Sequence, residues 1–509
     1  MRLRLCEGTF SPARKRGLTP SRRLHPGGVR SILPAKVAVL AFSITGGWSG
    51  MRRWLNVLAL SVLALLDALP VASPASAATG TASSTPAASP PSVVATEDWS
   101  AALLPGGDAL AVGVAVGPSA IVAVGERACE SQGSRPARCW GQAWTSADGI
   151  TWDTPDARTS GLDLGHFRPT TSGPEVGIEG VAYGPAGFLA FGRAEAGDRG
   201  QVSAVWRSGD GAAWERLTAA DGFPPGTRLR TILGADDGYL LGGVIYGDRA
   251  PRAAIWSSPD GRTWTLARGK ETFDIGGYID TMEDPMAGGI NGLALYPGPS
   301  DGTGGALADG AIAVGQGCMP SLDKEPWAWN GACWGQLWRS TEGLTWQKGE
   351  MPRPQGAIGS AVAAGERLVI DAPICFDDCA SALMVTDDVA EWSVAYGSPV
   401  DGDLRALASK GAGFQAILAV PDGQTKQHGY ALTLWSSEDG TNWALERPQP
   451  RLPIVITWLD HVDIAAAGDR LVVTASGWAG PDQLVSVALL SPAMSKARTG
   501  ASLVKGGPG

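Results

Sequence analysis

The sequence is dominated by a nine-residue motif that begins and ends with Trp. Residues 144–152 read "WTSADGITW", and the other copies keep the same separation between their two end positions. These copies are 206–214 "WRSGDGAAW", 256–264 "WSSPDGRTW", 338–346 "WRSTEGLTW", 435–443 "WSSEDGTNW" and a degenerate copy, 384–392 "MVTDDVAEW". A motif that recurs in this way indicates an architecture built from repeats of one structural unit.

Each copy has the chemistry of a β-hairpin. The Asp-Gly pair favours a tight turn with positive φ, and apolar residues flank it. The Ser and Asp side chains can bond the amides of the turn. A second hairpin pattern precedes each copy, such as "GVAYGPAGFLAFG" at 180–192. We therefore expect four short strands in each unit.

The upstream hairpins indicate how many units there are and how the chain closes. The seventh hairpin is followed by one strand at Val485–Leu490 and then by Pro492, without a Trp-bearing fourth strand. The segment 97–105 "EDWSAALLP" resembles 390–397 "AEWSVAYG" and can supply that strand. We predict an all-β fold, a seven-bladed β-propeller of four-stranded blades over residues 96–492, closed by the strand around Trp99. The seven hairpins begin near Val112, Glu179, Arg230, Asn291, Gly359, Arg405 and Val462.

The motif resembles the Asp-box, or BNR repeat, of sialidase-type β-propellers, whose pattern is S-x-D-x-G-x-T-W. In "SADGITW" at 146–152 the Asp and Gly are adjacent, so one residue of that pattern is missing. In that family the box is a turn between the third and fourth strands, on the face away from the active site. The resemblance implies a structural role in the turns for Asp148, Trp152, Asp210, Trp214, Asp260, Trp264, Trp346, Asp439 and Trp443.

The N-terminal region has the features of an export signal. Met51-Arg52-Arg53 precedes the apolar run Leu55–Leu66, and Ala75-Ser76-Ala77 fits a cleavage site. We expect a signal peptide at 51–77, after a segment 1–50 that is either a start-site artefact or an extended n-region. The apolar run is short for a bilayer span, so we expect a secreted or extracytoplasmic protein without stable membrane insertion.

Composition defines the flanking segments and the classes of partner. Residues 78–95 are rich in Ala, Ser, Thr and Pro and are expected to be a linker, and 493–509 a disordered tail. Residues 78–509 carry 30 basic and 48 acidic residues, a net charge of −18, which argues against nucleic acid as a partner. The four His are scattered and the Gly residues lie in turns, so we expect neither a metal site nor a cofactor.

Six cysteines of the expected propeller form three close pairs along the chain. A zinc site is the alternative to disulfides, but the pairs lack His partners and CxxC spacing. An exported chain favours disulfides. Each pair lies in a loop between the second and third strands of its unit, and the predicted bridges are Cys129–Cys139, Cys318–Cys333 and Cys375–Cys379.

The Cys-bearing loops and the long connections 154–176 and 266–288 are expected on the face opposite the boxes, which we call the Cys-loop face. Loops on a rigid scaffold are where function usually lies. Alignment of the first strands places several polar residues near the channel mouth on this face, where two Arg could hold an anionic group. Alternatively, these side chains pair with one another or with solvent. The candidate ligand-binding residues are Glu179, Arg230, Asn291, Arg405 and, approximately, His461.

Two classes of function compete. The first is an exported, monomeric, non-catalytic propeller that serves as a binding or scaffold module for a protein or glycan ligand at the Cys-loop face. The alternative is a sialidase-like glycoside hydrolase with a diverged active site. The "F/Y-R-I-P" motif of the sialidases precedes their first box, whereas this chain has only "HFRPT" at 166–170, after its first box. The resemblance therefore assigns no catalytic residue.

The disulfide prediction can be tested on exported protein by peptide mapping without reduction. We expect three cross-linked peptides that contain the pairs given above, because each pair lies within one loop. Free thiols, or links between different loops, would contradict the prediction. The Cys375–Cys379 bridge is the most demanding, since only three residues separate its cysteines.

Overall fold

The structure is a computed structural model in which all described residues belong to the second of two separate units, Ala87–Gly509. The first unit, with the predicted signal peptide, lies outside the described residues, as does the predicted C-terminal tail beyond 493. The described ranges are 94–95, 99–107, 109–127, 130–132, 135–167, 177–196, 201–217, 223–246, 251–268, 273, 289–296, 310–318, 333–349, 351, 360–364, 367–372, 374–375, 379–380, 382–395, 402–422, 429–480 and 483–493. Within them, no helix is long and apolar enough to cross a membrane.

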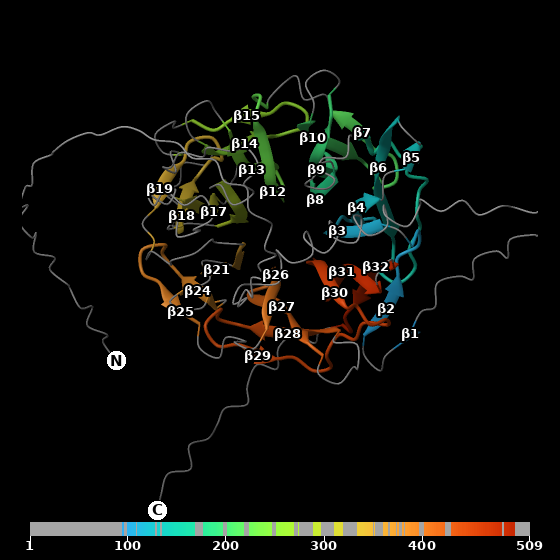
Figure 1. Ribbon diagram of the computed structural model, residues 1–509. Helices are drawn as coiled ribbons and strands as arrows, with labels where there is room; N and C mark the ends of the chain where they lie inside the picture. Colours follow the sequence, from blue (N-terminus) through green and yellow to red (C-terminus); the bar gives the residue numbers. More distant parts are fainter. Residues whose placement is uncertain are drawn as a thin grey trace, which may run out of the picture. The chain divides into compact units, whose positions relative to one another are not determined.

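Seven antiparallel sheets form the blades of a β-propeller, which confirms the predicted fold class (Figure 1). Blade 1 contains β3 Ala109–Val116, β4 Ile121–Arg127 and β6 Arg135–Ser146. Blade 2 contains β8 Gly177–Gly184, β9 Gly187–Glu195, β10 Gln201–Ser208 and β11 Glu215–Leu217. Blade 3 contains β12 Thr227–Ala235, β13 Gly238–Ile245, β14 Arg252–Ser258 and β15 Thr265–Leu266. Blade 4 contains β16 Gly289–Leu295, β17 Ala311–Cys318, β18 Cys333–Ser340 and β19 Gln347–Gly349.

The remaining blades follow the same order. Blade 5 contains β20 Ala361–Ala364, β21 Arg367–Asp371, β24 Leu383–Thr386 and β25 Ser393–Val394. Blade 6 contains β26 Asp403–Lys410, β27 Gly413–Pro421, β28 Tyr430–Ser437 and β29 Ala444–Leu445. Blade 7 contains β30 Trp458–Ala467, β31 Arg470–Gly480, β32 Gln483–Leu490, β2 Ser100–Leu103 and β1 Val94–Ala95. The first strands contact one another in sequence, and β30 contacts β3, so the innermost strands form a closed ring.

The last blade is closed by the N-terminal strand, as the sequence predicts. Ser100 pairs with Leu490 and Leu103 with Val487, so β2 occupies the place of the missing fourth strand. Trp99 is 2% exposed, and its indole donates a hydrogen bond of 3.0 Å to the carbonyl of Pro448 in the connection from blade 6. One feature was not expected, because β1 adds a fifth strand outside β2.

Blade 1 differs from the expected four-strand pattern. Its fourth position is a single bridge between Thr145 and Asp153. The N-terminal part of β6 instead pairs with β5, Glu130–Gln132, and with β7, Asp163–Phe167. The stretch 154–176, expected as a loop, therefore includes a strand. A further small hairpin in blade 5 consists of β22, Ile374–Cys375, and β23, Cys379–Ala380.

The strand register separates the two faces of the ring. In blade 2, Gly177 at the start of β8 lies opposite Arg193 near the end of β9. Ser208 at the end of β10 lies opposite Phe188 at the start of β9, and the box follows it. The starts of the first strands and the ends of the second strands therefore lie on the Cys-loop face, and the boxes lie on the other face.

Seven apolar clusters fill the junctions between neighbouring blades in the described part of the chain. Each cluster combines two adjacent blades, as Val122 and Phe188 do between blades 1 and 2. Trp99 belongs to the cluster between blades 6 and 7. Five other clusters each hold the Trp that ends a motif, namely Trp152, Trp214, Trp264, Trp346 and Trp443.

The Asp of each box is occupied by the backbone of its own turn. Asp148 Oδ1 accepts hydrogen bonds from the amides of Ile150 (2.8 Å) and Thr151 (2.7 Å). The same pair of bonds, to the amides two and three residues later, recurs at Asp210, Asp260, Asp388 and Asp439. The motif Trp donates its indole N–H to the Gly carbonyl in the boxes of Trp152, Trp214, Trp346 and Trp443, whereas the buried Trp264 indole N–H has no partner.

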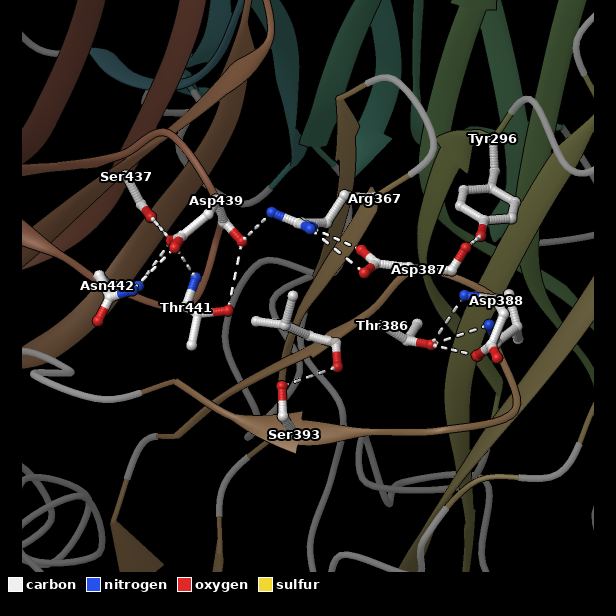
Figure 2. A network of polar contacts seen from close by, with 12 residues as sticks. Tyr296, Arg367, Thr386, Asp387, Asp388, Ser393, Ser437, Asp439, Thr441 and Asn442 are labelled. Atoms are coloured by element: carbon white, nitrogen blue, oxygen red, sulfur yellow. Dashed lines mark hydrogen bonds and ion pairs between the residues drawn. The ribbon is translucent and has the colours of Figure 1, made fainter. Parts of the chain in front are cut away.

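Blade 5 carries the degenerate box and a bridging network in its place. Val389 occupies the Gly position with φ 64°, a strained conformation for a β-branched residue. Figure 2 shows Arg367 between the boxes of blades 5 and 6. Its guanidinium binds both carboxylate oxygens of Asp387 (2.5 and 3.2 Å) and the carbonyl of Asp439 (2.9 Å). Tyr296 of blade 4 donates to the carbonyl of Asp387 (2.7 Å), so three blades are joined here.

A substitution at Gly211 tests how tightly the box of blade 2 packs against blade 1. A Cβ at Gly211 would lie 2.2 Å from Val122 Cγ2 in blade 1, and its φ is +80°. We expect Gly211→Ala to lower the free energy of unfolding by about 3 kcal/mol, from backbone strain together with overpacking. Denaturant unfolding would measure the change. Gly468→Ala is the matched control, because Gly468 has φ +62° with open space around it, so only strain of about 1–2 kcal/mol should remain. Equal losses in the two variants would contradict tight packing at the box.

Candidate functional site

The first strands carry an extra residue close to their starts. The register shifts in β3, β8, β12, β16, β26 and β30, and a shift of this kind marks a β-bulge. The extra residues are Val112, Glu179, Arg230, Asn291, Arg405 and Asp460. Because bulges re-aim side chains, these positions form one level of the inner ring near the Cys-loop face.

The predicted candidate residues occupy this level, with one correction. Glu179, Arg230, Asn291 and Arg405 are all bulge residues. In blade 7 the extra residue is Asp460, and the predicted His461 pairs instead with Ser476. The sequence pattern places this position only approximately, and His461 is the residue that follows the bulge. The predicted hairpin start Gly359 lies outside the described residues.

Direct contacts among these side chains cross between neighbouring blades and within them. The Arg230 guanidinium donates 2.9 Å to Asn291 Oδ1 of the next blade. Burial lowers the pKa of Arg230. Tyr246 raises this pKa, and the charge of Arg228 lowers it further. Within blade 2, Arg193 Nε lies 2.9 Å from Glu179 Oε1. The alternative that polar groups pair with one another is thus realised in part, but none of these pairs is an ion pair between blades.

The sixth and seventh blades add a second group of charges. Arg405 forms an ion pair with Asp403 (2.7 Å), although its Nε is buried without a hydrogen-bond partner. His461 keeps an exposed surface. Partial desolvation by the surrounding protein lowers its pKa, while the charge of Asp460 raises it and that of Arg405 lowers it. Trp458 donates its indole N–H to Asp460 Oδ1 (2.6 Å) and lies opposite Trp478 in the sheet. Two half-buried indoles therefore flank this part of the level.

Two acidic residues of the level were not found from the sequence. Glu126 lies near the end of β4, and burial raises its pKa to about 6, with Arg193 lowering it and Glu179 and Asp460 raising it. Asp371 ends β21, and burial together with the charge of Asp403 raises its pKa to about 7. Asp371 Oδ1 is buried without a hydrogen-bond partner. Both residues lie at or next to the end of a second strand. The repeated motif does not predict their role, because the charged groups that act on them come from other blades.

The backbone brings two of the three predicted cysteine pairs opposite each other. Cys318 lies directly opposite Cys333, and Cys375 directly opposite Cys379, in antiparallel pairs. Cys139 is 1% exposed and disulfide-bonded, while Cys129 lies outside the described residues. The three pairings stay predictions. Within the described ranges, no three His, Cys, Asp or Glu side chains are placed to hold a metal ion.

No protein-family model matches the sequence, and no curated protein sequence matches it significantly. Comparison with solved structures finds matches at low identity. A protein of unknown function from Dyadobacter fermentans is 11% identical, with a TM-score of 0.39, over 77% of this chain and 97% of that one. The α-L-arabinofuranosidase Arb93A from Fusarium graminearum is 12% identical, with a TM-score of 0.35, over 75% and 93%. The Trypanosoma rangeli sialidase is 11% identical, with a TM-score of 0.34, over 75% of this chain and 54% of that one.

The raised and lowered pKa values predict a maximum of stability in mild acid. Burial raises the pKa of Asp371 to about 7 and of Asp463 to about 6, so their contribution to stability is present below pH 4 and is lost as the pH rises through 6–7. At Asp439, partial burial raises the pKa, but hydrogen bonds in the turn outweigh it and lower the pKa to about 2. The contribution of Asp439 to stability is therefore present above pH 4 and is lost as the pH falls toward 2. Melting temperatures should therefore peak near pH 4–5.

Asp371→Asn isolates one part of this dependence. We expect the variant to be more stable than the parent by about 1 kcal/mol at pH 8 and to differ little at pH 4.5, because it removes a buried ionisation. Melting curves at the two pH values would measure this. Glu438→Gln, at an exposed box position, is the control and should change neither value. A variant that lost stability at pH 8 would show that the Asp371 carboxylate is held favourably.

Proposed function

We propose that this protein is an exported, non-catalytic β-propeller that binds an acidic saccharide at the channel mouth on the Cys-loop face. The observation that carries the proposal is the ring of bulges, which brings polar side chains of five blades to one level. Few convergent polar groups on a rigid scaffold are the usual composition of a binding site. Export is proposed from the signal-like segment 51–77 and the paired cysteines.

The chemistry of the level supports a ligand with both an anionic group and hydroxyl groups. Arg230 and Arg405 can bind a carboxylate through charge-assisted hydrogen bonds. Their local positive field can oppose the net negative charge of the chain. Carboxylates and the Asn291 amide bind hydroxyl groups, and the Trp458–Trp478 pair supplies apolar faces for a sugar ring.

A glycan array, followed by calorimetry, tests this function with matched variants. We expect retention of saccharides that carry uronic or sialic acid and weaker binding of neutral saccharides of equal length. Arg230→Ala and Arg405→Ala should each weaken binding by about tenfold or more, because each removes a charge-assisted contact. Melting temperatures should change little, since both side chains are partly exposed.

Arg262→Ala is the control, because Arg262 lies in the box of blade 3, on the other face, where it pairs with Glu215. It should bind like the parent protein. If no acidic saccharide is retained, or if Arg262→Ala weakens binding as much as the channel-mouth variants, the proposed site is wrong.

A glycoside hydrolase is the second candidate function. One observation favours it, namely that Glu126 with its raised pKa lies near a second carboxyl group, Glu179. Two carboxyl groups in different protonation states are the basic requirement of glycosidic bond cleavage. A screen with fluorogenic glycosides would separate the candidates, since turnover that Glu126→Gln abolishes would establish hydrolysis.

A further inference from the structure

The carboxyl group of Glu126 lies at the junction of blades 1 and 2. A Cβ at Gly177, the first residue of β8, would lie 2.5 Å from Glu126 Oε2, so the carboxyl group packs on the backbone of the next blade. The glycine leaves room for the carboxyl group at this position. In its own blade, Glu126 lies opposite Leu110 and Gly141, which carry no charge. The carboxyl group therefore lies against the first strand of blade 2 rather than extending into solvent.

Three charged groups face Glu126 from other elements, namely Glu179 on β8, Arg193 on β9 and Asp460 on β30. Arg193 pairs directly with Glu179, and Asp460 accepts the Trp458 indole N–H. Within the described residues, Glu126 itself takes part in no ion pair. Arg193 is thus the cation that acts on Glu126, and it is already paired with Glu179.

This arrangement favours a neutral Glu126 in mild acid. Burial raises its pKa to about 6, and the nearby Glu179 and Asp460 oppose its ionisation further. A neutral carboxyl group donates an O–H bond, whereas a carboxylate can only accept. A neutral Glu126 can therefore donate to a hydroxyl group, while the Glu179 carboxylate, which acts on it electrostatically, can accept from one.

We propose that Glu126, as a neutral acid beside the Glu179–Arg193 ion pair, donates a hydrogen bond to a hydroxyl group of the bound saccharide and so makes binding stronger in mild acid. The inference rests on the proposed function and names a further recognition residue of the same site. Ionisation of Glu126 removes the donor and adds a negative charge that repels an acidic ligand. Affinity should therefore fall by about tenfold for each pH unit above 6.

Calorimetry between pH 5 and 7.5 tests the inference with three probes: a galacturonic acid trisaccharide, a glucuronic acid disaccharide and 3′-sialyllactose. Glu126→Gln keeps a donor that cannot ionise, so it should bind at pH 7.5 within about threefold of the parent affinity at pH 5, without the slope. Glu126→Ala should lose about tenfold or more at pH 5, because the donor is gone. Melting curves confirm that each variant is folded.

His461→Gln is the control for the other titratable side chain near Asp460, and it should keep the parent slope. A slope that persists in Glu126→Gln, or that disappears in His461→Gln, overturns the inference. Binding of a probe with no pH dependence overturns it as well and leaves the proposed function standing. If none of the probes binds the parent protein at any pH, both the proposed function and this inference fail.

Discussion

The structure depends on apolar packing between neighbouring blades. Each blade is a small sheet with a short outer strand, and isolated sheets of this size are marginally stable in water. In the described part of the chain, the seven junction clusters bury apolar residues of neighbouring blades against one another, and most of these clusters contain a buried Trp. Ring closure matters for the same reason, because Trp99 fills the junction of blades 6 and 7 from the N-terminal strand.

The two faces of the ring differ in the polar contacts that they make. On the box face, the Asp of five boxes accepts hydrogen bonds from amides two and three residues later, so these turns are held by their own residues. Where the motif has degenerated in blade 5, Arg367 joins the boxes of blades 5 and 6, while Tyr296 adds a bond from blade 4 (Figure 2). On the Cys-loop face, the contact between Arg230 and Asn291 links residues of two neighbouring blades that lie far apart in the chain.

This difference decides what the sequence could predict. The blade number, the closure by the strand at Trp99 and the common level of Glu179, Arg230, Asn291 and Arg405 follow from a local motif and its spacing, whereas the β-bulges do not. Glu126 and Asp371 give no local signal, because burial and charges from other blades set their chemistry. In blade 7 the bulge residue is Asp460, one residue before the approximate prediction, His461. Strand β7 was missed because its partner, the extended part of β6, lies beyond the repeat unit.

A ring of equivalent strands makes the channel mouth open to chemical variation. The bulge residue stands outside the strict alternation of the strand. Val112 packs against the cluster between blades 1 and 2, whereas the polar bulge residues belong to none of the seven apolar clusters of the described residues. Val112, Glu179, Arg230, Asn291, Arg405 and Asp460 accordingly differ in size and charge at equivalent positions, while the Trp residues of the junctions recur. Selection for a ligand can thus act on single residues of the level without disturbing the packing that closes the ring.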